Sequence, residues 1–233
     1  MEVNMTNLEK LTDVLMSGNV KNGFYNLLKD KSFKLWILNL IPEIVDCKNC
    51  KQNTPWHLYN VLDHILISVE QINKLTANME YKKRKMFSYI MFLHDLGKPK
   101  CKQHYLFKGK TFDTFPNHQQ ESEIIAKRVL SKLGFSEKEV KLMCTLILNH
   151  DLFNKIVKEP KRIDQKKFCD ELIKSLVSNF NTFGDGIDIL NSIVIIGIAD
   201  NKAQNAELTK KPLEILEETI LILNKLKKNE NQM

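Results

Sequence analysis

The chain has 233 residues, which is enough to bury a hydrophobic core and fits one domain, or one domain with a small extension. Its 43% hydrophobic and 27% charged residues are typical of a globular protein and exclude a disordered or collagen-like chain. The 35 Lys and Arg against 28 Asp and Glu give a net charge of +7, which favours anionic ligands such as nucleotides or RNA. The basic residues lie in short scattered runs that fit solvated helix faces, so the sequence does not decide whether the protein binds nucleic acid.

Nothing in the sequence indicates export or a membrane span. The first ten residues lack a basic segment followed by an apolar stretch. The apolar run from Ile193 to Ala199 is far shorter than the roughly 20 residues that a membrane helix needs. Five cysteines, an odd number, indicate reduced thiols and a cytoplasmic protein. Cys47 and Cys50 have no second pair at zinc-site spacing, so we expect two incidental thiols in a loop.

Helical signals follow one another along the whole chain. Two capping boxes, Thr6 with Glu9 and Ser136 with Glu139, mark helix starts. Pro212 is expected near the start of the last helix. The spacing of apolar residues predicts helices after residue 6 and over 21–29, 32–40, 56–75, 81–96, 117–133, 136–149, 164–180, 187–206 and about 212–227, with loops at 42–55 and 100–116. We therefore expect an all-α fold without strands, with a helical extension at 1–50, a bundle at 51–208 and a C-terminal helix at 209–233 that packs on it.

Several of the predicted helices carry a histidine or an aspartate in phase with their apolar residues. One buried histidine alone is more often a hydrogen-bonded core residue than a ligand. A carboxylate inside an apolar helix is harder to explain, because an unpaired buried charge destabilises the fold or becomes neutral. A shared cation is the economical explanation for several such helices converging. The residues in question are His64, His94, His118, His150 and Asp200.

The adjacent residues His94 and Asp95 add a geometric constraint. Neighbouring side chains project about 100° apart on a helix, so both reach one ion only near a helix end, where the backbone turns. Gly97 and Pro99 predict a helix end at this position. The pair is therefore expected at the end of a helix and beside the metal.

The order of His64, His94-Asp95 and Asp200 resembles the H…HD…D pattern of the HD superfamily of metal-dependent phosphohydrolases. The chain looks most similar to the HD domain found beside CCA-adding and poly(A) polymerase-type nucleotidyltransferases, over about two thirds of its length. The matching segments are Gln52–His57 followed by Val61-x-x-His64, FLHDLGKP (92–99), FDTFPNHQQES (112–122), LILNHD (146–151) and IADNKAQN (198–205).

The resemblance implies an HD-domain helical bundle, a site for one or two divalent ions and cleavage of phosphate esters. Asp95 is then both a ligand and a catalytic residue, and it can bridge the two ions. Nitrogen and oxygen ligands suit Mn, Fe, Co, Ni or Zn, and Mg is also possible. The implied ligands are His64, His94, Asp95 and Asp200 for the first ion, and His118 and His150 for the second.

The chain also departs from the family's better-known members. We find no Gly-rich strand and turn with paired aspartates, so we expect a free-standing HD protein without the nucleotidyltransferase head and without tRNA end synthesis. Leu96 to Pro99 stand where alarmone hydrolases carry an acidic pair, and a GYP-type cyclic-dinucleotide motif is missing. Asp151 follows His150, where many relatives have a second histidine.

Other polar residues have two readings each. Lys98, one turn from Asp95, either stabilises the charge of a substrate phosphate or is a solvated cation at a helix end. His57 is either a substrate contact or a structural histidine; seven residues before His64, it cannot share an ion with it. Three further residues could orient the metal ligands, but surface or structural roles are favoured for them. His104 is expected to be exposed. The three are Asp63, Arg128 and Asp151.

Three functions remain open from the sequence. We favour a phosphohydrolase that acts on a nucleotide phosphomonoester, a cyclic nucleotide or a related RNA-end-like phosphodiester through a metal-activated water. A di-iron oxygenase of the HD type that acts on a small substrate is an alternative. A non-catalytic module that is stabilised by metal and binds RNA or a protein is the third.

Overall fold

The computed structural model describes residues 5–153, 165–182 and 184–230. This part of the chain is predominantly helical, with one small two-stranded sheet, and the all-α prediction is confirmed. None of its helices combines the length and the apolar content needed to cross a membrane. The helices are α1 (Asn7–Leu15), α2 (Val20–Leu27), α3 (Lys31–Leu40), α4 (Glu43–Asn49), α5 (Val61–Leu75), α6 (Tyr81–Leu93), α7 (Lys98–Cys101), α8 (His118–Lys132), α9 (Glu137–Leu148), α11 (Gln165–Phe180), α12 (Gly186–Lys202) and α13 (Ala206–Glu230).

Local signals explain several of these boundaries. Both predicted capping boxes are present, at Thr6 before α1 and at Ser136 before α9. Asn60 caps α5 by accepting from the backbone N–H of Asp63 at 2.8 Å, so α5 begins at Val61 and not at Trp56 as predicted. The predicted start of α11 at Asp164 lies outside the described residues.

Two other predicted boundaries near the C-terminus are wrong. Helix α12 ends at Lys202, not at Ala206, and α13 begins at Ala206, so Pro212 lies inside α13. A proline near the beginning of a helix loses few backbone hydrogen bonds, since the first N–H groups of a helix have no partner in any case.

The segment 42–55 is not wholly a loop, which corrects a second prediction. Pro42 precedes the short helix α4, whose first turn carries Glu43 and whose Ile44 and Cys47 are buried three residues apart. Cys47 therefore lies in a helix, and Cys50 ends it. Both are free thiols, and neither belongs to a group of potential metal ligands among the described residues.

A β-hairpin occupies most of the segment 100–116, where the sequence predicts only a loop. Its strands are β1 (Gln103–Phe107) and β2 (Lys110–Thr114), which pair antiparallel. Lys108 and Gly109 form the two-residue turn with φ values of 50° and 73°, both positive as a tight hairpin turn of this length requires. Across the strands the rings of Tyr105 and Phe112 lie 5.8 Å apart. The sequence did not predict these strands because most of their residues are exposed and show no alternation of polar and apolar residues.

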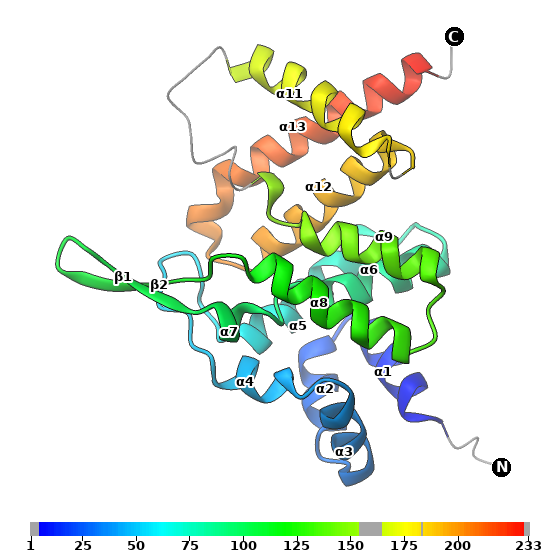
Figure 1. Ribbon diagram of the computed structural model, residues 1–233, viewed down its shortest axis with the longest axis vertical. Helices are drawn as coiled ribbons and strands as arrows, with labels where there is room; N and C mark the ends of the chain where they lie inside the picture. The colour runs from blue at the N-terminus through cyan, green and yellow to red at the C-terminus, as the bar shows by residue number, and fades with distance from the viewer. Residues whose placement is uncertain (1–4, 154–164, 183, 231–233) are drawn as a thin grey trace.

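The helices form layers around one continuous hydrophobic core. Figure 1 shows α1 to α3 at one end of the molecule, α11 and α13 at the other, and the helices that carry the predicted ligands between them, with the hairpin projecting to one side. Phe24 of α2 contacts Phe92 of α6, with ring centroids 5.5 Å apart. Leu11 near the N-terminus and Leu223 near the C-terminus belong to the same buried cluster. The N-terminal helices are thus packed against the helices that position the site.

Candidate metal centre

Four buried side chains converge where the middle helices meet. His64 projects from the first turns of α5, His94 and Asp95 from the turn that ends α6, and Asp200 from the apolar helix α12. All four are at most 5% exposed. Helix α6 ends at Leu93, three residues earlier than predicted, so the His94-Asp95 pair lies in the turn itself. There the backbone can direct both side chains to one point, as the sequence analysis required.

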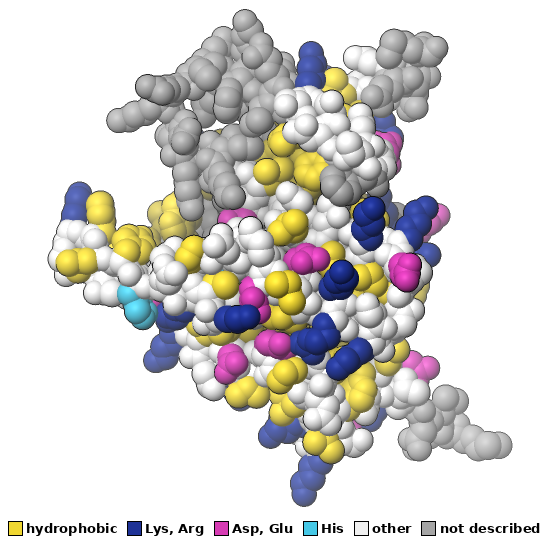
Figure 2. Space-filling view, in the orientation of Figure 1, with side chains coloured by type: hydrophobic (Ala, Val, Ile, Leu, Met, Phe, Trp, Pro, Cys, Tyr) yellow, Lys and Arg dark blue, Asp and Glu magenta, His cyan; other side chains and the backbone are white. Residues whose placement is uncertain are grey.

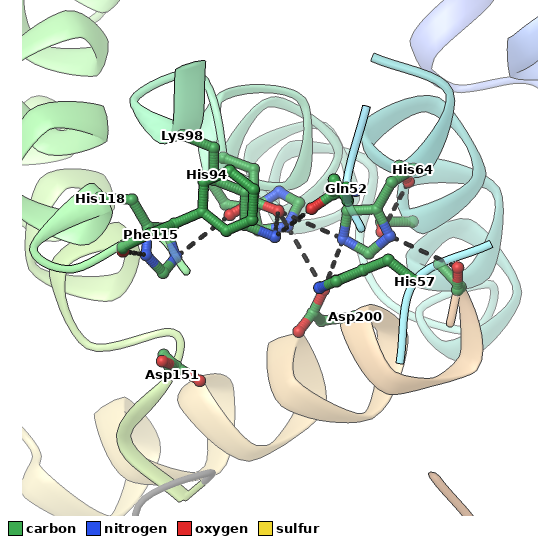
Figure 3. Close-up of polar contacts among 12 residues, drawn as sticks. Gln52, His57, His64, His94, Lys98, Phe115, His118, Asp151 and Asp200 are labelled. Carbon is green, nitrogen blue, oxygen red and sulfur yellow. Dashed lines mark hydrogen bonds and ion pairs between the residues drawn. The ribbon is translucent and has the colours of Figure 1, made fainter. Parts of the chain in front are cut away.

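The first ligand group, defined as His64, His94, Asp95 and Asp200, is compact. His64 Nε2 lies 2.8 Å from Asp200 Oδ1 and 3.2 Å from Asp95 Oδ2. His94 Nε2 lies 3.5 Å and 3.3 Å from the same two oxygens. One potential ligand atom from each residue lies within 4.8 Å of the others. Two imidazole nitrogens and two carboxylate oxygens therefore surround one point, and this group is able to hold a metal ion (Figure 3).

The second ligand group, defined as Asp95, His118 and His150, uses the other oxygen of the same carboxylate. Asp95 Oδ1 lies 3.3 Å from His118 Nε2 and 3.7 Å from His150 Nε2, and the two nitrogens are 3.3 Å apart. All three residues are buried. Asp95 thus contributes Oδ2 to the first group and Oδ1 to the second, as a bridging carboxylate would.

The backbone orients most of these imidazole rings. In three of them Nδ1 donates to a carbonyl three residues earlier, so Nε2 keeps its lone pair for an ion. His64 has a longer contact, 3.4 Å from Nδ1 to Ala203 O. The three short bonds are His94 to Met91 O (2.7 Å), His118 to Phe115 O (2.8 Å) and His150 to Ile147 O (2.6 Å).

The buried polar atoms of the site have unfilled hydrogen-bonding capacity that a cation could satisfy. The Nε2 atoms of His64 and His94, both oxygens of Asp95 and Oδ1 of Asp200 are buried without a hydrogen bond of proper geometry. Burial alone would lower the pKa of His94, but the adjacent carboxylates outweigh burial and raise its pKa to about 10. Conversely, the pKa of Asp95 and of Asp200 is held well below its usual value, against the effect of burial, by the neighbouring imidazoles, with Lys98 also acting on Asp95. A divalent ion with nitrogen and oxygen ligands fits this donor set.

Lys98 is a buried cation beside the ligands. Its Nζ lies 2.7 Å from Asp95 Oδ2 and donates to Gln52 Oε1 at 3.2 Å. Burial lowers the pKa of Lys98, but the negative charge of Asp95 and Asp200 more than compensates, so its pKa is raised and it stays charged. Lys98 is only 5% exposed, and the alternative of a solvated helix-end cation is therefore wrong.

Gly97 allows α8 to approach the turn that carries the ligands. A Cβ atom at this position would lie 2.6 Å from both His118 O and Ser122 N, closer than side chains pack. Its own N–H donates to Ser122 Oγ at 2.9 Å. Because His118 begins α8, the missing side chain of Gly97 allows His118 to lie close to the turn that carries Asp95.

A cavity of about 700 Å³ opens onto both groups. Its lining includes the buried side chains of Asp95, Lys98 and Asp200, and also His57. His57 lies in the loop before α5, not in the helix predicted over 56–75, and its ring is 5.1 Å from that of His64. Burial is the main cause that lowers the pKa of His57, to about 2, so its ring is neutral. It belongs to neither ligand group.

The other candidates lie outside the two groups. Asp63 bonds Tyr25 Oη and Lys21 Nζ, both at 2.8 Å, and so has a structural role. Asp151 accepts from Gln119 at 2.9 Å and lines the cavity, apart from the ligands in Figure 3. Arg128 pairs with Glu43 and the carbonyl of Leu40, and His104 is exposed beside Asp113.

Sequence reasoning missed several residues that face the cavity. Tyr105, Phe107 and Phe112 of the hairpin line it, and so does Trp56. A signal was present, because the two residues Lys108 and Gly109 separate two short segments that carry Tyr105, Phe107 and Phe112, an arrangement that fits a hairpin. Gln52 lies in one of the segments that carry the resemblance, but no role was predicted for it.

The fold and the two ligand groups together define an all-α protein with a buried histidine–aspartate cluster able to hold metal ions. A scan of known protein families found no family model that matches the chain, and a search of curated proteins found no match either.

Proposed function

We propose that the chain is a metal-dependent phosphohydrolase of the HD type, which cleaves a phosphomonoester or phosphodiester bond of a nucleotide or an RNA-end-like substrate. The observation that carries the proposal is the position of Asp95, whose two oxygens each face a separate group of imidazoles. Paired metal sites that share a carboxylate are suited to displacement at phosphorus, since the attacking and leaving oxygens both need stabilising.

Each side chain has a role that follows from its position. His64, His94, Asp95 and Asp200 would hold the first ion, and Asp95, His118 and His150 the second. Divalent ions held there would supply Lewis-acid chemistry, which would lower the pKa of a water molecule and polarise a phosphoryl oxygen.

Lys98 places a positive charge in the lining of the cavity, beside Asp95, where it stabilises the charge that develops on the phosphate. His57, being neutral, contributes a hydrogen bond to the substrate without repelling a cation. The net charge of +7 favours the approach of an anion to this cavity.

The test is metal analysis of the purified protein, followed by a hydrolysis screen. The protein is stripped with EDTA, reloaded with Mn, Ni, Mg or Fe, and assayed on nucleotide mono-, di- and cyclic phosphates. We expect up to two bound ions per chain and release of phosphate, or ring opening, only after reloading. The absence of turnover with every ion would contradict the proposal, and O₂-dependent turnover with iron would show an oxygenase instead.

A pair of variants ties any activity to the ligands. Asp200→Asn removes one carboxylate of the first group, and we expect at least about a 100-fold loss of turnover, because the metal no longer stabilises the transition state. Asp151→Asn is the matched control, since Asp151 lines the same cavity but belongs to neither group. Equal losses in both variants would exclude Asp200 as a specific ligand.

A further inference from the structure

The hairpin β1–β2 presents one aromatic face to the metal-binding cavity. Side chains alternate between the faces of a strand, so Tyr105 and Phe107 of β1 share a face. Their partners in the register are Phe112 and Lys110, which lie on that face too. Tyr105, Phe107 and Phe112 all line the cavity that contains Asp95 and Lys98. The aromatic strip is thus continuous with the candidate active site.

These rings are not needed to fill the core. Tyr105 is 48% and Phe107 56% exposed, and neither belongs to the buried cluster. Figure 2 shows hydrophobic side chains gathered along the projecting hairpin, with a basic side chain at its tip. An exposed apolar strip next to a polar site commonly marks a surface that binds a ligand.

The base of the hairpin is held firmly against the body of the protein. Asp113, which is 5% exposed, accepts from the backbone N–H of Asn53 at 2.6 Å and from Lys102 Nζ at 2.8 Å. Its own backbone N–H donates to Asn53 O at 3.0 Å, and its other carboxylate oxygen pairs with His104 at 2.8 Å. The strip is therefore fixed in direction before a ligand arrives, which reduces the entropy lost on binding.

Cations accompany the strip. Lys98 lines the same cavity, with its Nζ 2.7 Å from Asp95 Oδ2. At the hairpin turn Lys108 Nζ lies 5.4 Å from the centre of the Phe107 ring, and Lys110 is opposite Phe107 in the register. Positive charge beside stacking surfaces is the combination that binds single-stranded nucleic acid, since its bases stack and its phosphates need cations.

We propose that the aromatic face of the hairpin is a stacking platform for a single-stranded nucleic-acid end, whose terminal phosphate lies at the metal centre. The inference rests on the proposed function for the position of that phosphate. A base next to the terminal phosphate stacks on the Tyr105–Phe112 pair, and the following base reaches Phe107. Tyr105 and Phe107 are two residues apart along the strand, about 6.6–6.8 Å, so the strip accommodates more than one nucleotide.

Equilibrium binding without turnover tests the platform. Calorimetric titrations in EDTA compare a tetra-adenylate RNA with phosphate at both ends against AMP, so that no metal-dependent hydrolysis interferes. We expect the tetranucleotide to bind at least about 10-fold more tightly than AMP, because it stacks on a second ring and meets further cations. Equal affinity for the two ligands, or no binding of the tetranucleotide, would overturn the inference.

Three variants locate the bases. Phe107→Ala should weaken tetranucleotide binding by about 5- to 150-fold and leave AMP unchanged, whereas Tyr105→Ala should weaken both. Leu106→Ala is the matched control, because Leu106 is 74% exposed but lies on the opposite face of β1. If Leu106→Ala weakens binding as much as Phe107→Ala, the platform is excluded.

The two proposals can fail separately. A protein that shows this binding pattern but hydrolyses no phosphate ester after metal reloading keeps the platform and loses the hydrolase. A protein that hydrolyses esters but binds AMP and the tetranucleotide equally keeps the hydrolase and loses the platform.

Discussion

The substitution Asp95→Asn removes the charge of the carboxylate that both ligand groups share, with almost no change of shape. In the metal-free protein this carboxylate is the partner of Lys98 at 2.7 Å, and both side chains are buried. Loss of one partner leaves the other buried charge uncompensated, which destabilises the fold by about 3–5 kcal/mol. For a chain of this size 1 kcal/mol corresponds to about 2–4 °C, so we expect Tm to fall by about 6–20 °C.

Thermal unfolding followed by circular dichroism, with and without EDTA, measures both effects of the substitution. Wild-type protein loaded with Mn should lose stability when EDTA is added, since the ion binds the folded state only. The Asp95→Asn variant should unfold at the same temperature in both buffers and retain no ion in metal analysis.

The control is Asp63→Asn, which removes a partly exposed pair with Lys21 at 2.8 Å. Such a pair contributes about 0–1 kcal/mol, so Tm should change by less than about 4 °C. An Asp95→Asn protein that keeps two ions and unfolds within about 2 °C of the wild type would refute the reasoning about the shared carboxylate.

Three further substitutions or conditions test the site. Gly97→Ala places a methyl group 2.6 Å from His118 O, so we expect α8 to shift away from the turn. Metal analysis should then show one bound ion instead of two. Two ions bound at wild-type affinity would contradict the close packing at Gly97. Lys98→Gln should keep both ions but lower kcat by about 10²–10³-fold, and an unchanged kcat would exclude its role at the phosphate. In EDTA, Tm should fall between pH 7 and pH 10. The pKa of His94 is about 10 in the folded protein and 6.5 in the unfolded chain. The protonated His94 ring therefore stabilises the fold fully below pH 6.5, and this stabilisation disappears as the pH approaches 10. Metal affinity should rise over the same interval because binding displaces protons, and a metal-free Tm that rises with pH would refute this assignment of charge.

The sequence predicted which helices exist better than it predicted where they begin. Capping residues such as Thr6 and Ser136 are local signals, and both helix starts that they predict are found. The start of α5 was misplaced because the segment before Asn60 is as apolar as a helix, with Trp56 and Leu58. Short elements such as α4 and the hairpin depend on contacts with distant residues, for example Asp113 with Asn53, and these contacts leave no periodic pattern.

The residues predicted to meet around a cation do lie together. The physical reason can be seen in the sequence. A carboxylate in an apolar helix, such as Asp200, needs a partner, and the partners had to come from other helices with polar residues on their buried faces. The sequence could not reveal how far the neutral His57 lies from the ligands, or that Lys98 is buried against Asp95. Both depend on packing distances between segments that are far apart in the chain.

The local hydrogen bonds that orient the imidazole rings have a consequence for the choice of metal. His94, His118 and His150 are each aimed by a carbonyl only three residues earlier, so their directions are set within single segments of backbone. If the proposed metal centre is correct, an incoming ion would not have to order these rings. The preferred ionic radius is then governed by how closely the segments approach one another, and substitutions at contacts such as Gly97 offer a way to retune the centre for a different metal without altering any ligand.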